Sequence, residues 1–284
     1  MLDRGRHEDG KMQTSAEMYP LIVGLPSYFV MWGVACSVVV PLGTWLGIRA
    51  GFPAMKSFVA FLGFAALILA GAKFLYLAEA ALFPLDDYVP PEHRGPLHGF
   101  RIPGGIVLLA VLGPFVSRGL GLPWRRFGDA VIIAAPLALI GIRVGCFLNG
   151  CCFGKLSHVP WAISFPEGSL ALAYQLKRGM VPAGSAWSLP VHPLQLYFAA
   201  AALLIGCALV AGRRQVGGDG ALQFGFYALF FSSTAALETL RANFLTLNNL
   251  IVPVAALLSA VVVVSMLWKT QGTEMAIGDY RRVP

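Results

Sequence analysis

Residues 55–82 read MKSFVAFLGFAALILAGAKFLYLAEAAL, and this stretch decides the fold class. No charged residue lies between Lys56 and Lys73. A helix of ~20 apolar residues crosses the ~30 Å hydrocarbon core of a bilayer, because each residue adds ~1.5 Å. The stretch is therefore predicted to be a membrane-spanning helix.

Apolar runs of similar length recur along nearly the whole chain. We predict an all-α membrane protein with about seven transmembrane helices. The predicted spans are Tyr19–Ile48, Met55–Leu82, Gly104–Val116, Phe127–Leu148, Leu194–Val210, Ala221–Leu240 and Leu247–Trp268. Composition agrees, since 57% of residues are hydrophobic and 12% are charged, against about 45–50% and about 25% in soluble domains. The mean hydropathy of +0.71 also lies on the membrane side.

The predicted organisation is one polytopic membrane domain, residues 19–269, flanked by two polar tails. Residues 1–18 form the N-terminal tail and residues 270–284 a cytoplasmic tail. The first apolar run is too long for the hydrophobic region of a signal peptide, so it is expected to be retained. The longest connection is an outer loop, residues 155–192, in which Gly168–Lys177 is expected to form a short helix.

The net charge of +7 comes from Lys and Arg in short loops rather than from a basic stripe. Cytoplasmic loops of membrane proteins are enriched in these residues. The basic loops are the first, third and fifth and the C-terminal tail, with Arg49, Lys56, Arg118, Arg125, Arg126, Arg213, Arg214, Lys269, Arg281 and Arg282. The N-terminus is therefore predicted outside and the C-terminus inside the cell. Nucleic-acid binding is not expected, because no basic residues alternate with aromatic ones.

The strongest local motif is GIRVGCFLNGCCFGK, Gly141 to Lys155. Arg143 lies about six residues before the Asn149-Gly150 turn, which places it about 9 Å inside the helix end. Charged residues at such a depth usually face a polar cavity or a partner. The guanidinium suits a phospholipid phosphate, because its planar fork makes bidentate contacts. An ion pair with Glu238, or extension to the interface, is the alternative.

The same motif contains glycines and cysteines with open interpretations. Gly141, Gly145, Gly150 and Gly154 are spaced for close helix packing, and they also let a lipid headgroup approach the backbone. Cys146, Cys151 and Cys152 follow a C-x4-C-C pattern without the second pair of most zinc sites, so no metal is expected. His158 and His192 are additional candidate ligands for such a site, but the spacing does not require them. A reactive thiolate at Cys146 beside Arg143 is a further alternative to simple packing.

Two segments at predicted span starts carry polar groups. HGFRIPGGIVLL, His98 to Leu109, places Arg101 before Gly104 and Gly105, whose N–H groups can bind an anion at a helix start. A plain turn is the alternative. HPLQLY opens the fifth span and places Gln195 and Tyr197 just inside the interface.

The sixth predicted span ends with an acid and a base. Glu238 and Arg241 are three residues apart, which places them on one helix face and favours an ion pair. Acids inside a membrane span are usually functional, so Glu238 is also a candidate site residue.

In this order, the motifs resemble those of the bacterial prolipoprotein diacylglyceryl transferases. That family carries a signature close to G-R-x-G-N-F-I-N-G-E-x-x-G, followed by P-W-G-x-x-F-P and H-P-x-Q-L-Y-E. This chain reads IRVGCFLNGCCFG, PWAISFP and HPLQLYF. The resemblance implies an enzyme of the bacterial cytoplasmic (inner) membrane. Such an enzyme transfers diacylglyceryl from phosphatidylglycerol to the lipobox cysteine of a prolipoprotein and releases glycerol-1-phosphate, with no metal or other cofactor.

The resemblance also implies roles for individual residues. Arg143 matches the signature arginine and is implied to bind phosphate, with Glu238 and His98 as further catalytic candidates. The implied substrate-binding residues are Arg101, Gly104, Gly105, Gly145, Cys146, Asn149, Gly150, Gly154, Gln195, Tyr197 and Arg241. The implied partners are phosphatidylglycerol, membrane lipid and the signal peptide of a prolipoprotein or another acceptor.

The chain departs from the family pattern at several positions. The family histidine before Gly-Gly is Pro103, the signature Asn is Cys146, the signature Glu is Cys151, the last Glu of the QLYE motif is Phe198, and a family arginine is Thr234. The general base is therefore unassigned between His98 and Glu238. A transferase with a different acceptor and an inactive lipid-binding paralogue are the alternative functions.

Overall fold

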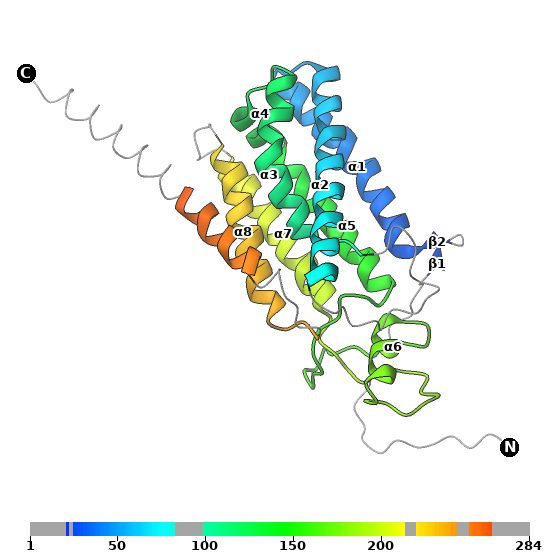
Figure 1. The fold of residues 1–284 in the computed structure, drawn as a ribbon. Coiled ribbons are helices and arrows are strands. Elements are labelled where there is room, and N and C mark those ends of the chain that lie inside the picture. The colour runs from blue at the N-terminus through cyan, green and yellow to red at the C-terminus, as the bar shows by residue number, and fades with distance from the viewer. Residues whose placement is uncertain (1–20, 23–24, 83–98, 214–219, 243–249, 263–284) are drawn as a thin grey trace, which may run out of the picture.

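The computed structural model describes residues 21–22, 25–82, 99–213, 220–242 and 250–262 (Figure 1). Within these ranges the protein is a bundle of long helices that run alternately up and down. Their bounds are α1 Ser27–Arg49, α2 Ala54–Leu82, α3 Ile102–Gly119, α4 Trp124–Val131, α5 Ala135–Leu148, α6 Leu170–Lys177, α7 Leu194–Gly212, α8 Ala221–Glu238 and the helix Leu250–Val262. The predicted polar tails, residues 1–18 and 270–284, lie outside the described residues.

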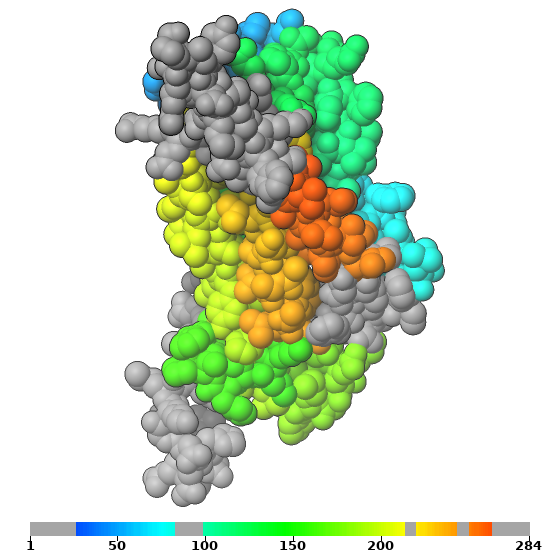
Figure 2. Space-filling view, turned by 90° about the vertical axis from the view of Figure 1, so that its left-hand side faces the viewer, coloured from blue at the N-terminus to red at the C-terminus, as the bar shows by residue number. Residues whose placement is uncertain are grey.

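Five helices of the described part are long and apolar enough to cross a membrane: α1, α2, α3, Trp124–Leu148 and α7. The helical membrane class is thereby confirmed. The sixth and seventh predicted spans coincide with α8 and Leu250–Val262. Polar residues such as Gln223 interrupt the apolar character of α8, and the described part of the last helix, Leu250–Val262, is shorter than a full span. Figure 2 shows this last helix beside α8.

Two of the predicted spans are interrupted near proline. In the first, Leu21–Ile22 (β1) and Leu25–Pro26 (β2) pair antiparallel, and α1 starts only at Ser27. Proline disfavours the helical conformation in the residue before it, which explains the late start. The fourth contains a 3-10 turn, Ile132–Ala134, before α5. Pro136 follows that turn and cannot donate the N–H that would continue the ladder.

The outer faces of the long helices carry large apolar side chains. Phe74 on α2, Phe115 on α3 and Leu204 on α7 are 72%, 68% and 69% exposed. A soluble protein rarely exposes so many large apolar residues together. These faces fit contact with lipid chains.

The predicted basic loops gather at one end of the bundle. Arg49, Arg118 and Arg213 end α1, α3 and α7, and α4 carries Arg125 and Arg126 beside them (Figure 1). The opposite end holds the start of α7 and the segment that contains α6.

The long connection between α5 and α7 folds into a compact unit. The expected short helix is present as α6, and Ser169 caps it by accepting a hydrogen bond from the Leu172 N–H at 3.2 Å. The unit has its own apolar core of Phe153, Phe165, Ala171, Tyr174 and Val191. It lies at the end of the bundle where α5 ends and α7 begins (Figure 1).

Glycines set the close approach of α2 and α3. A Cβ built on Gly105 would lie 2.4 Å from the Ile68 carbonyl oxygen, and one on Gly104 would lie 2.6 Å from the Gly71 oxygen. Both contacts are with backbone, so a side chain there requires the helices to move apart. Small residues at such crossings permit tight helix packing in lipid.

We expect Gly105→Val to destabilise the protein by about 2 kcal/mol or more, because overpacking forces α3 away from α2. The midpoint of unfolding in mixed detergent–SDS micelles measures the effect. Gly33→Ala is the matched control, since nothing lies within 4 Å of a Cβ built on Gly33 in α1. An unchanged midpoint for Gly105→Val would show that α2 and α3 are not held this closely.

Candidate functional site

The Asn149-Gly150 turn of the signature motif is a regular helix end. At the end of α5, Cys151 donates its N–H to the Cys146 carbonyl at 3.1 Å, and Gly150 donates to Phe147 at 3.0 Å. This pair of bonds is the Schellman motif, which requires a left-handed residue after the cap. Gly150 supplies it with φ 62°. Asn149 is the C-cap residue itself.

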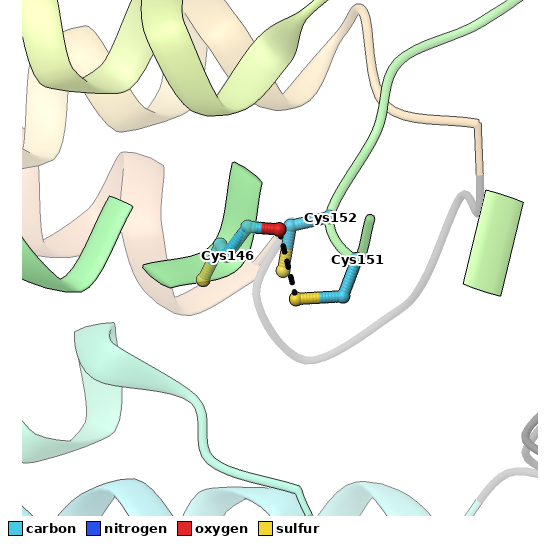
Figure 3. Close-up of side chains that lie close together, drawn as sticks. All are labelled: Cys146, Cys151 and Cys152. Carbon is cyan, nitrogen blue, oxygen red and sulfur yellow. Dashed lines mark hydrogen bonds between the residues drawn. The ribbon is translucent and has the colours of Figure 1, made fainter. Parts of the chain in front are cut away.

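The turn brings three cysteines together, which the C-x4-C-C spacing did not predict. The Sγ atoms of Cys146, Cys151 and Cys152 all lie within 4.8 Å of one another (Figure 3). Cys151 Sγ also donates to the Cys146 carbonyl at 3.6 Å. Cys152 is the one described non-glycine residue with a positive φ, 59°. A cysteine in this conformation is strained, and such residues concentrate at functional sites.

Arg143 lies in α5 within reach of the same cluster. It is 8% exposed, and its guanidinium carbon is 4.0 Å from the centre of the Phe198 ring. Among the described residues no carboxylate forms an ion pair with it. A buried cation stacked on an aromatic ring retains donors for an anionic ligand.

The predicted pair of Glu238 and Arg241 is confirmed. Arg241 donates from Nε and Nη2 to the two carboxylate oxygens of Glu238, at 2.5 and 2.7 Å. The alternative partner for Arg143 is thereby occupied by Arg241. Arg241 also lies 6.0 Å from the Phe198 ring centre, so two guanidinium groups approach one aromatic ring.

These charges act on the cysteine cluster. The pKa of the Cys152 thiol is lowered well below its usual range, first by hydrogen bonds from Cys146 and Cys151 and then by the charges of Arg241 and Arg143. The pKa of Cys151 is raised well above that range, chiefly because its thiol is a hydrogen-bond donor to its neighbours. The two guanidinium groups thus favour the charged form of Cys152.

Backbone from two distant segments holds the end of the cysteine turn in place. Gly154 donates its N–H to the His192 carbonyl at 2.9 Å and pairs with Arg241 in an isolated bridge. Lys155 donates to Leu240 at 2.8 Å. A Cβ on Gly154 would lie 2.6 Å from His192 Cβ, so the glycine is required for this close approach.

Gln195, fully buried on α7, ties this helix to the cysteine turn. Its Nε2 donates to the Cys151 carbonyl at 2.6 Å. Its Oε1 is buried without a hydrogen-bond partner among the described residues. A buried acceptor of this kind is suited to a donor on a bound molecule.

Replacing Gln195 by leucine is expected to lower stability by about 1–3 kcal/mol, because the Cys151 carbonyl loses its donor in a buried position. Thermal unfolding in detergent measures this, with Leu196→Met as control because Leu196 is 39% exposed on the same helix. Equal melting of both variants would show that the turn does not depend on the Gln195 amide.

Tyr197 belongs to a neighbouring polar group. Its hydroxyl accepts a hydrogen bond from Trp161 Nε1 at 2.6 Å and lies 3.1 Å from His192 Nδ1. Trp161 and His192 come from the PWAISFP and HPLQLY motifs, so the structure brings these two motifs together.

The other predicted residues that the structure describes lie elsewhere at this end of the bundle. Arg101 pairs with Glu79, which is completely buried on α2, at 2.5 Å. The Gly104 N–H donates to the Arg101 carbonyl, and both Gly104 and Gly105 face α2. A Cβ on Gly145 would lie 2.8 Å from Met31 Cβ, which places this glycine in the contact between α5 and α1. His98 lies outside the described residues.

Two site residues were not identified from the sequence. Glu79 is an acid within an apolar helix, and that feature alone makes a residue a candidate. Phe198 was noted only as a departure from a motif, yet its ring contacts Arg143 and lies near Arg241.

Comparison with known proteins identifies the family. The model of the family described as prolipoprotein diacylglyceryl transferase matches residues 20–270. The chain belongs to this family. A phosphatidylglycerol–prolipoprotein diacylglyceryl transferase of Rhodopirellula baltica is 29% identical over 173 residues, which cover 56% of this chain and 34% of the relative. Proteins of the same name from Methylocella silvestris and Brucella ovis are 32% and 31% identical, over 49% and 50% of this chain and 45% and 46% of theirs.

The matched segments thus span less than half of each of these relatives. Several departures from the motif pattern of the diacylglyceryl transferase family are close together in this chain. Its departures at Cys146, Cys151 and Phe198 lie together around Arg143. Thr234, a further departure, is buried in α8.

Proposed function

We propose that this protein is a diacylglyceryl transferase that uses phosphatidylglycerol as donor and a lipobox cysteine thiol as acceptor. The observation that carries the proposal is Arg143, a buried guanidinium at the end of a membrane helix with no carboxylate partner among the described residues. Family membership and the names of the relatives support the same donor and acceptor.

Two cations act on the phosphate of the donor in this proposal. The phosphate binds beside Arg143, and the guanidinium carbon of Arg241 lies 6.0 Å from the centre of the same Phe198 ring. As the acceptor sulfur attacks the glycerol carbon, negative charge develops on the departing phosphate. Fixed cations in a site of low polarity stabilise such charge in the transition state. Glu238 holds Arg241 in position through its two carboxylate oxygens.

The proposed orientation places the site at the outer leaflet of the bacterial inner membrane. The basic end with Arg49, Arg125 and Arg213 faces the cytoplasm, in accord with the distribution of Lys and Arg in membrane proteins. α8 and Leu250–Val262 complete seven spans in this arrangement, with the N-terminus outside. The segment between α5 and α7 then lies on the outer side, beside the incoming signal peptide.

The donor reaction tests the proposal. Purified protein is incubated with phosphatidylglycerol labelled in its headgroup glycerol, with and without a lipobox peptide, and soluble glycerol phosphate is measured. We expect release that depends on the peptide cysteine and that is absent with a Cys→Ser peptide. Release without any peptide would indicate another acceptor, and bound but intact lipid would indicate a lipid-binding paralogue.

A further inference from the structure

The three clustered cysteines are the feature of the site that the family's chemistry does not explain. We propose that Cys146, Cys151 and Cys152 bind a zinc ion whose fourth position receives the acceptor thiol. This inference rests on the proposed transferase function. In this proposal the cluster activates the acceptor thiol. The sequence did not identify a single general base for that step.

The geometry of the sulfurs fits this ion. Zn–S bonds of about 2.3 Å hold tetrahedral sulfurs about 3.8 Å apart, and the three Sγ atoms already lie within 4.8 Å of one another. No other His, Asp or Glu of the described residues belongs to this group. Structural zinc sites are closed by four protein ligands, whereas catalytic sites have three and an open position. With three ligands among the described residues, the cluster matches the second kind.

The surrounding charges favour a sulfur-rich zinc site. Three thiolates and Zn²⁺ carry one net negative charge, and an acceptor thiolate adds another. Such charge is costly in a buried place unless cations lie nearby. Arg143 and Arg241 both interact electrostatically with Cys152, and Arg143 has no carboxylate partner among the described residues.

The proposed step is balanced without a protein base. The acceptor thiol binds zinc as a thiolate and its proton passes to water, since metal coordination deprotonates a thiol. The zinc-bound sulfur then attacks the glycerol carbon that carries the phosphate. A C–S bond forms, the C–O bond breaks, and its electron pair leaves on the phosphate oxygen beside Arg143. The product is a neutral thioether, a weaker ligand than the thiolate, and it dissociates.

The position of the cysteines relates this step to the family pattern. The family histidine is Pro103 here and the signature Glu is Cys151, so both are replaced by groups that cannot accept a proton in the same way. A metal-bound thiolate removes the need for that acceptor.

Metal content and spectroscopy test the binding. The full chain is purified in detergent under reducing conditions, zinc is measured by mass spectrometry, and Co²⁺ is substituted to report thiolate-to-cobalt charge transfer. We expect a single zinc ion per chain, lost in Cys146→Ser, Cys151→Ser and Cys152→Ser and retained in Cys207→Ser, whose thiol is exposed on α7. A lipobox peptide should strengthen the charge-transfer band, and its Cys→Ser version should not. A cobalt spectrum indifferent to the peptide thiol would overturn the proposal.

A second test removes the metal from the unmodified chain, so its result does not depend on whether the cysteine variants fold. Chelation is expected to lower transfer by about a hundredfold or more, the usual contribution of a positioned proton acceptor, and added zinc should restore it. Undiminished transfer by metal-free protein would refute the zinc site while leaving the transferase function intact. A peptide-dependent cobalt spectrum without any transfer would support the thiol-binding site and count against the transferase function.

Discussion

Arg143→Ala is expected to reduce diacylglyceryl transfer by about a hundredfold or more while the protein remains inserted and folded. Removing a single fixed group that stabilises developing charge typically costs this much. The guanidinium makes no ion pair among the described residues and contacts the Phe198 ring, so its loss leaves no carboxylate of the described part unpaired. The rate of peptide modification at saturating lipid measures the effect.

Arg143→Lys is the matched variant, because it retains the charge without the planar fork. We expect it to be intermediate, since lysine cannot make the bidentate contact with phosphate. A control at the opposite end of the bundle is Arg213→Ala, which removes a cation next to Trp45 and Arg49. Full activity of Arg143→Ala would show that the phosphate binds elsewhere.

Arg241→Ala is expected to destabilise the protein by about 3–5 kcal/mol, because it leaves the Glu238 carboxylate buried without its partner. Both side chains are shielded, with 14% of Arg241 and 8% of Glu238 exposed. Unfolding in mixed SDS micelles measures the loss.

The double variant Glu238→Leu/Arg241→Met separates stability from function. Replacing both members of a buried pair by apolar residues is often neutral for stability, so we expect unfolding close to that of the original protein. Transfer should still be lost, because the second cation near the phosphate is gone. Recovery of both stability and transfer would limit the pair to a structural role.

The sequence predicted the features that depend on composition and local spacing. Apolar runs gave the membrane helices, and the i,i+3 spacing gave the pair of Glu238 and Arg241. The predicted helix boundaries were wrong near proline, at Pro26 and before α5. Length and hydropathy alone do not show that proline lacks the N–H donor of a helix.

Sequence patterns could not predict the contacts between segments that are distant in the chain. The C-x4-C-C spacing spans a helix end, and only the left-handed turn at Gly150 and Cys152 brings the three sulfurs together. The pairing of Arg101 with Glu79 likewise joins two helices whose relative register follows from glycine packing. The ring of Phe198 replaces a carboxylate of the motif, so charge alone gave no reason to place it against Arg143.

The intact mass of a lipobox peptide, after incubation with the purified chain and phosphatidylglycerol, tests the proposed transfer most directly. We expect the cysteine peptide to gain the mass of one diacylglyceryl group, and the Cys→Ser peptide to remain unchanged. Arg143→Ala protein should leave both peptides unmodified. A cysteine peptide of unaltered mass, with folded protein and donor lipid present, would contradict the account.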